Sequence, residues 1–184
     1  TDYVGFQKVP GPTIPLFAIP TTAGTGSEVT ASSVITDAST NYKMAIISYN
    51  LIPSYALLDP EMIMSLPAGV AASCGVDAFI HALEAYVSKE ANPFTDAMAE
   101  KAMELIGGSI RRFVASRDNE EAACSMMLGS TLAGISFAWA KLGNVHAMSH
   151  PVSGFFHVAH GVANSILLPN IVEITALADN GRYR

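Results

Sequence analysis

Cysteine and charge are scarce in this sequence of 184 residues. It contains two cysteines, Cys74 and Cys124, without a CxxC arrangement. This argues against a disulfide framework and favours buried thiols in a reducing cytoplasm. Only 14% of the residues are Asp, Glu, Lys or Arg, and the net charge is −6 with scattered basic residues, which argues against nucleic acid as a partner. The N-terminus lacks a basic segment followed by an apolar one, so no secretory signal is expected.

Long apolar runs are also missing, although half of the residues are hydrophobic. Such a composition fits either a membrane protein or part of a larger protein that buries much of this surface. No stretch of about 20 apolar residues is free of charges or helix breakers, so we expect no membrane span. We therefore favour the second explanation.

The chain divides near residues 59–65 into a strand-rich and a helix-rich part. Short aliphatic runs separated by turn residues predict strands at 16–20, 32–36, 43–48 and 55–59. The second and third runs predict a hairpin with its loop at residues 37–42. From Ser65 onward the pattern is helical. We expect Ser65 and Asn92 to be N-caps, a helix from Asn119 to Leu142 that stops at Gly143, a break at Pro151, and a last helix at 161–178.

All five histidines lie in two short blocks. His81 follows Asp77 by four residues, and His146, His150, His157 and His160 lie within fifteen residues. Side chains at i and i+4 share one face of a helix. Two helices of this kind can close around one divalent metal ion, which points to a metal-centred active site.

The hypothetical ligand set is Asp77, His81, His146 and His160. Three imidazoles and one carboxylate suit Fe(II) or Zn(II) and do not suit Ca(II) or Mg(II). A single buried histidine is more often a core residue, at roughly 70% for each alone, but the clustering reverses those odds. The metal would polarise a carbonyl or alcohol oxygen.

Neighbouring polar residues have less definite roles. His150 lies one turn after His146, where a place beside the substrate or a nicotinamide ring fits better than ligation. His157 could line the pocket, support a ligand or face solvent. Glu84 is most simply a surface charge of its helix, with a hydrogen bond to a ligand as the alternative.

A second motif, Pro20-Thr-Thr-Ala-Gly-Thr-Gly-Ser-Glu28, follows the first predicted strand. Small residues let backbone amides approach a ligand, and threonine hydroxyls add donors. A plain turn explains the composition equally well. The segment is neither a GxGxxG fingerprint nor a P-loop, and the absence of GxSxG and HExxH leaves serine-hydrolase and zincin readings unsupported.

The sequence resembles the iron-containing (group III) alcohol dehydrogenase family over nearly its whole length. Four blocks carry the resemblance: IPTTAGTGSEVT, LLDPEM, SLPAGVAASCGVDAFIHALEAYVS and GNVHAMSHPVSGFFHVAHGVANSILLPN. The resemblance implies an α+β chain in which residues 1–60 end an α/β nucleotide-binding domain and residues 61–184 form a mainly all-α metal-binding domain. The family's Gly-Gly-Gly-Ser turn and final helices have no counterpart, so we expect an internal fragment of a longer enzyme.

Matched residue by residue, the resemblance implies Fe(II) bound by Asp77, His81, His146 and His160, with Zn(II) as the other candidate. It places His150 near the nicotinamide and the reacting carbon. It also assigns cofactor contacts to Thr21, Thr22, Thr25 and Lys43.

The expected activity is NAD(P)-dependent alcohol oxidation or aldehyde reduction in the cytoplasm. The expected partner is a small alcohol or aldehyde, without nucleic acid or membrane partners, and a homo-oligomer is an open alternative. Two other readings remain: a dehydroquinate-synthase-like lyase or polyol dehydrogenase of the same architecture, and a non-catalytic metal-binding fragment. The sequence does not distinguish NAD from NADP, because the residue that would read the ribose lies outside it.

Overall fold

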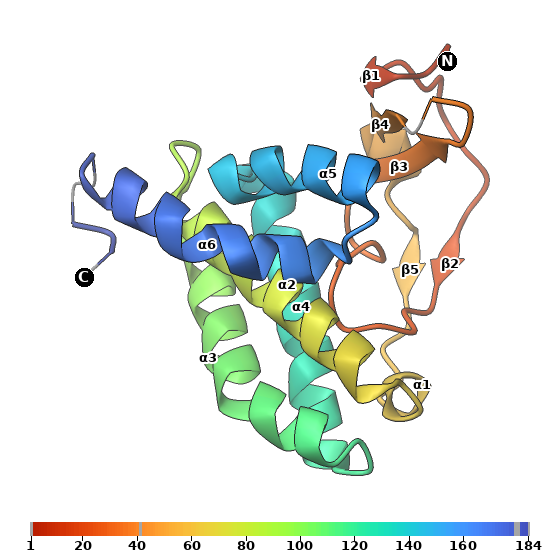
Figure 1. The fold of residues 1–184 in the computed structure, drawn as a ribbon. Helices are drawn as coiled ribbons and strands as arrows, with labels where there is room; N and C mark the ends of the chain where they lie inside the picture. The colour runs from red at the N-terminus through yellow and green to blue at the C-terminus, as the bar shows by residue number, and fades with distance from the viewer. Residues whose placement is uncertain (1, 41, 179–180, 184) are drawn as a thin grey trace.

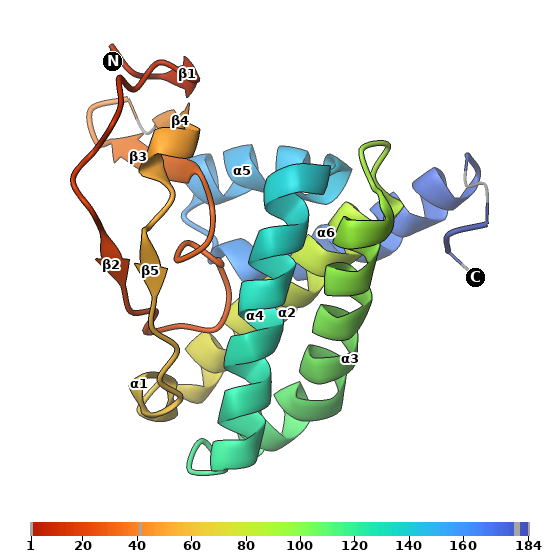
Figure 2. The same cartoon turned by 180° about the vertical axis from the view of Figure 1, so that it is seen from behind.

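The computed structural model describes residues 2–40, 42–178 and 181–183, with Lys43 described by its backbone alone. Short strands from the first third of the chain gather at one end of the molecule, and helices make up the rest (Figure 1). This arrangement confirms the predicted α+β class. The view from behind shows the strands lying beside the helices α4 (Glu120–Ala140) and α5 (Asn144–Phe156) (Figure 2).

A three-stranded sheet contains the predicted hairpin. Its order is β1 (Gly5–Phe6), β4 (Tyr42–Ile47) and β3 (Ser32–Asp37), and β3 and β4 are antiparallel. Asp37 shapes the turn, because its Oδ1 accepts hydrogen bonds from the backbone N and the Oγ of Ser39. The hairpin prediction is therefore confirmed.

A second sheet consists of two very short parallel strands, β2 (Phe17–Ala18) and β5 (Tyr55–Ala56). The aliphatic runs predicted longer strands here. Among the described residues each strand has one neighbour, so few residues complete a hydrogen-bond ladder. Several large apolar side chains around this pair are exposed, as expected for parallel strands that normally have both faces covered; they are Ile14, Leu16, Phe17, Ile19, Tyr55 and Leu57.

Three long helices form the core: α2 (Ala68–Val87), α3 (Pro93–Ala115) and α4 (Glu120–Ala140). Alanines dominate their buried positions, together with Ile106, Phe113 and Met126. Small side chains let the helix axes approach closely. By length and composition α2 and α4 could cross a membrane, but at least half of each apolar stretch is buried inside the bundle, as in the core helices of soluble proteins.

Helix boundaries follow some of the predicted caps. Asn92 caps α3 in a capping box with Thr95, as predicted. The helix expected to run from Asn119 is α4, and Asn119 is its N-cap. The prediction for Ser65 is wrong: it ends the short helix α1 (Glu61–Met64), and α2 starts after Pro67 without a side-chain cap. Helix α4 ends at Ala140 rather than Leu142, and Lys141 turns the chain with φ +70°.

Of the last two helices, α6 (His160–Ala176) crosses the bundle over α2, and α5 packs beside α6 (Figure 1). Gly143 does not stop the preceding helix; it is the N-cap of α5 (Asn144–Phe156). Pro151 lies inside α5 and does not end it, and α6 (His160–Ala176) contains Pro169. A left-handed residue, His157 with φ +53°, ends α5 and redirects the chain so that α6 can return. The histidine block thus spans two helices.

Candidate metal centre

Three helices bring the predicted ligands together in one buried cluster. Asp77 and His81 come from α2, His146 from α5, and His160 from α6. Asp77, His81 and His146 are each at most 5% exposed, and the His160 side chain is 28% exposed. Asp77, His146 and His160 offer ligand atoms that all lie within 4.8 Å of one another. His81 lies beside this trio rather than inside that limit.

The imidazoles converge on a single carboxylate oxygen, Oδ1 of Asp77. The Nε2 atoms of His146, His160 and His81 lie 3.4, 3.8 and 3.9 Å from it. The rings of His81 and His146 stack with their centroids 4.4 Å apart. One oxygen and three nitrogens thus surround the same small volume.

The opposite ring nitrogens have polar partners of their own. Nδ1 of each imidazole contacts one oxygen: the carbonyl of Gly24 for His81 (3.3 Å), Oε2 of Glu84 for His146 (2.6 Å) and Oγ of Ser153 for His160 (3.3 Å). A carbonyl or a carboxylate only accepts, so Nδ1 of His81 and of His146 carries the proton. In the neutral form of each ring, Nε2 then presents a lone pair toward Asp77, which is the tautomer a metal ligand needs.

The electrostatics favour the ligating forms of Asp77 and His81. Burial opposes ionisation of Asp77, but the hydrogen bond from His146 and the nearby imidazoles outweigh it and lower its pKa. Burial lowers the pKa of His81 to about 4, so its ring is neutral at neutral pH. His146 differs: burial disfavours its charged form, yet the hydrogen bonds to Asp77 and Glu84 outweigh that effect and raise its pKa.

The residues present fit a divalent transition metal. Three imidazole nitrogens and one carboxylate oxygen suit Fe(II) or Zn(II), and the described residues place no thiolate in this cluster. Asn164 supplies a further sign: it is fully buried, and its Oδ1 has no hydrogen-bond partner among the described residues. Buried polar atoms without a hydrogen-bond partner are few in folded proteins, and a bound ion is one of the explanations for them.

Asn164 is a site residue that the sequence reasoning missed. Its Nδ2 donates a hydrogen bond to Oδ1 of Asp77 at 2.6 Å and lies 3.2 Å from Nε2 of His146. The signal was present in the sequence, because Asn164 follows His160 by four residues. The three helices therefore carry three i, i+4 polar pairs rather than two.

His150 and His157 lie differently from the ligands. His150 is exposed, and its ring centroid is 5.0 Å from that of His160 and 6.4 Å from that of His146. It therefore borders the cluster on its open side. His157 is exposed at the end of α5.

The threonine loop lies directly beside the cluster. The carbonyl of Gly24, in the middle of the loop, contacts His81. Thr21 and Thr25 are exposed, and Thr22 is half-buried. Thr25 Oγ1 accepts a hydrogen bond from the backbone N of Ser27 at 3.3 Å. The backbone of Lys43 pairs with Thr36 in the hairpin, and its side chain lies outside the described part of the chain.

Helix α4 holds this loop in place. Thr131 donates a hydrogen bond of 2.6 Å to Oε1 of Glu28, which is 4% exposed. Gly26 adopts φ +61°, and a Cβ there would lie 2.7 Å from the Cα of Gly134. The loop backbone can approach the helix this closely because both residues lack a side chain.

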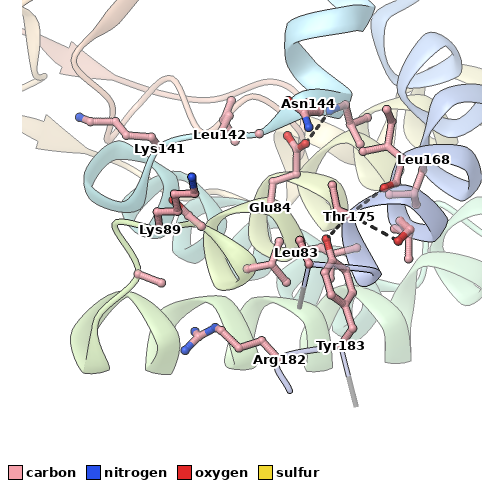
Figure 3. Close-up of a pocket in the computed structure, with 18 of the residues that line it drawn as sticks. Leu83, Glu84, Lys89, Lys141, Leu142, Asn144, Leu168, Thr175, Arg182 and Tyr183 are labelled. Atoms are coloured by element: carbon pink, nitrogen blue, oxygen red, sulfur yellow. Dashed lines mark hydrogen bonds between the residues drawn. The ribbon is translucent and has the colours of Figure 1, made fainter. Parts of the chain in front are cut away.

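A hollow of the described surface lies elsewhere, between the end of α2, the start of α5, α6 and the C-terminal residues 182–183 (Figure 3). Its volume is about 820 Å³, and none of the four candidate ligands lines it. The candidate functional site is the cluster around Asp77, because the side chains that can bind a metal converge there.

Comparison with known proteins gives a consistent result. Residues 71–184 match the Fe-containing alcohol dehydrogenase family, C-terminal, and residues 1–60 match iron-containing alcohol dehydrogenase. The chain is 42% identical over 182 residues to 1,3-propanediol dehydrogenase of Klebsiella pneumoniae, covering 99% of this chain and 47% of that protein. It is 41% identical to the NAD-dependent methanol dehydrogenase of Bacillus methanolicus, covering 99% of this chain and 48% of that protein.

A solved structure agrees in fold. The alcohol dehydrogenase from Oenococcus oeni superposes with a TM-score of 0.95 at 40% identity, covering 98% of this chain and 47% of that one. The chain thus spans about half the length of the relatives it matches. On these matches, the chain belongs to the iron-containing alcohol dehydrogenase family.

Proposed function

We propose that the enzyme containing this chain is a metal-dependent alcohol dehydrogenase or aldehyde reductase that uses NAD(P). The observation that carries the proposal is the convergence of three Nε2 atoms, from His81, His146 and His160, on Oδ1 of Asp77. Relatives named 1,3-propanediol dehydrogenase, NAD-dependent methanol dehydrogenase and lactaldehyde reductase support this reaction class.

Asp77, His81, His146 and His160 would hold the metal, Fe(II) in the first place and Zn(II) as the alternative. When bound, such an ion supplies Lewis-acid polarisation of the substrate oxygen. The protein's part is to present imidazole nitrogens and an ionised carboxylate. The outer contacts of Nδ1 orient the rings of His81 and His146 so that Nε2 faces Asp77 before any ion arrives.

The threonine loop would bind the nicotinamide cofactor, with Thr21, Thr22 and Thr25 as hydroxyl donors. Lys43, in the hairpin of β3 and β4, would contribute a further contact to the cofactor. The cofactor supplies the hydride chemistry. We favour NAD because one relative is named as NAD-dependent. The contact between Gly24 and His81 supports this role, since it joins the loop to the candidate metal centre.

His150 would transfer the proton of the alcohol hydroxyl to solvent. Its ring lies at the edge of the cluster and is exposed, so it can accept a proton from an alcohol hydroxyl and pass it to solvent. An imidazole suits this task because its ordinary pKa lies close to neutral pH.

The wider setting is also proposed. We assign residues 1–60 to the nucleotide-binding domain and residues 61–184 to the metal-binding domain. We expect a cytoplasmic enzyme that acts on a small alcohol or aldehyde, without nucleic acid or membrane partners, and whose subunits can form a homo-oligomer.

The test is anaerobic titration of the full-length enzyme with Fe(II) and with Zn(II), followed by assays of alcohol-dependent NAD and NADP reduction. Asp77→Ala and His146→Ala should lose bound metal and activity. His150→Ala should keep the metal and lose about 10²–10⁴-fold in rate, as expected for a proton-transfer group. His157→Ala is the matched control and should behave as wild type.

The competing functions give other results. Full activity in Asp77→Ala or His146→Ala would exclude the assignment. Metal binding without any alcohol oxidation, but with a lyase reaction, would favour the dehydroquinate-synthase-like alternative. Metal binding with no affinity for either nicotinamide cofactor would favour a non-catalytic metal-binding protein.

A further inference from the structure

Glu84 is a carboxylate enclosed between two helices and beside the candidate metal centre. It projects from α2 toward the start of α5 near Asn144 (Figure 3). It is 4% exposed, and among the described residues its one ion-pair partner within 4.0 Å is His146. The simple expectation of a surface charge is therefore wrong, and its burial needs a reason, since an unpaired buried carboxylate is costly.

Three donors surround this carboxylate, and all of them come from the first turn of α5. The backbone N of Val145 donates to Oε1 at 2.7 Å, and the backbone N of His146 donates to Oε2 at 3.4 Å. Nδ1 of His146 donates to the same Oε2 at 2.6 Å. The two oxygens thus accept hydrogen bonds both from the N-terminus of α5 and from the imidazole of a candidate ligand.

Helix α5 depends on this contact for its cap. Its own N-cap residue, Gly143, has no side chain to bond the free amides, and its first turn carries no acidic residue. A Cβ at Gly143 would lie 2.8 Å from Oε1 of Glu84, so the glycine leaves room for the carboxylate. A negative group at a helix N-terminus satisfies these amides and complements the helix dipole.

We propose that Glu84 is the positioning residue of the metal centre: it caps α5 across the fold and thereby fixes the ring orientation and tautomer of His146. This inference rests on the proposed function. One side chain from α2 sets both the start of α5 and the direction of the Nε2 lone pair that α5 contributes. Because α2 also carries Asp77 and His81, the contact fixes the position of α5 and its ligand relative to the two ligands of α2.

The arrangement also balances charge. A divalent ion beside Asp77 and three neutral imidazoles leaves one positive charge, and the Glu84 carboxylate offsets it through His146. Carboxylate–histidine–metal chains of this kind raise the basicity of the ligand. Glu84 thus affects the metal without touching it.

The experiment compares Glu84→Gln with Glu90→Gln in the full-length enzyme. Glu90 is exposed and lines the same hollow as Glu84, so it is a matched control. Zn(II) affinity is measured by competition with a chelator, and Co(II) is used to record the ligand-field spectrum. We expect a loss of about 10–100-fold in affinity for Glu84→Gln, with an altered Co(II) spectrum. Glu90→Gln should match wild type in both.

A second measurement does not depend on whether the variant folds. Nitrogen-15 NMR of histidine-labelled wild type with Zn(II) should show His146 protonated at Nδ1. Unchanged affinity and Co(II) spectrum in a folded Glu84→Gln variant would overturn the inference, and so would a proton on Nε2 of His146 in wild type. If wild type binds no metal at all, it is the proposed function that fails.

Discussion

Asn164 Nδ2 donates a hydrogen bond of 2.6 Å to Oδ1 of Asp77, the oxygen on which the three imidazoles converge. The same nitrogen lies 3.2 Å from Nε2 of His146. Asn164 thus orients the carboxylate from α6, as Glu84 orients an imidazole from α2. One amide from α6 and one carboxylate from α2 thus hold candidate ligand side chains by hydrogen bonds.

The first prediction concerns this amide. Asn164→Ala should lower the affinity for Zn(II) by about 10–100-fold, the usual cost of losing a partner of a metal ligand. Asn170→Ala, at an exposed position of the same helix, should bind as wild type. Chelator competition measures both. Equal affinities of the two variants would show that the contact with Asp77 has no influence on the site.

The second prediction concerns the close contact between the threonine loop and α4. Gly26→Ala places a side chain at a left-handed position and 2.7 Å from the Cα of Gly134. We expect the free energy of unfolding to fall by about 1–3 kcal/mol. Gly108→Ala, inside α3 with open space around it, should instead raise it by about 0.5–1 kcal/mol. Urea denaturation of the metal-free protein distinguishes them, and effects of the same sign would contradict the packing argument.

The third prediction concerns the hydrogen bond that joins the threonine loop to α4, which should affect cofactor binding but not metal binding. Thr131→Val removes the donor to the buried carboxylate of Glu28. The lost hydrogen bond to a charged group should cost about 1–3 kcal/mol in stability, and the looser loop should raise KM for the nicotinamide cofactor. Metal content should stay at the wild-type level. As a control, Thr175→Val removes a hydroxyl that bonds to Ile171 within α6 and to the hydroxyl of Tyr183, far from the loop, and should leave this KM unchanged.

The fourth prediction concerns the thiols. Burial, with a contribution from the Asp77 charge, raises the pKa of Cys74, whereas Cys124 is exposed. Because the thiolate is the reactive form, a disulfide reagent should modify Cys124 first and Cys74 slowly in the metal-free protein. The slow rate should increase as the pH rises. Cys124→Ser should remove the fast phase and Cys74→Ser the slow one; a fast Cys74 at neutral pH would contradict the raised pKa.

Several local features could be predicted from the sequence because short-range physics decides them. Asn92 and Pro93 start α3, since an asparagine cap and a proline at the first helical position suit the same terminus. The hairpin turn follows from Asp37 and its neighbours. Two cap predictions were wrong because serine and glycine occur at both kinds of helix end. Ser65 ends α1 instead of starting the next helix, and Gly143 starts α5 instead of ending α4.

The sequence by itself determined which chemistry is available: i, i+4 spacing places Asp77 with His81, and His146 with His150, on shared helix faces. Only the tertiary structure decided which of these groups meet and in what state. Asn164 and Asp77 are 87 residues apart, and His146 and Glu84 are 62 apart. Such partners depend on how α5 and α6 cross α2, and no local propensity specifies that crossing, because helix packing is set by side chains distant in sequence.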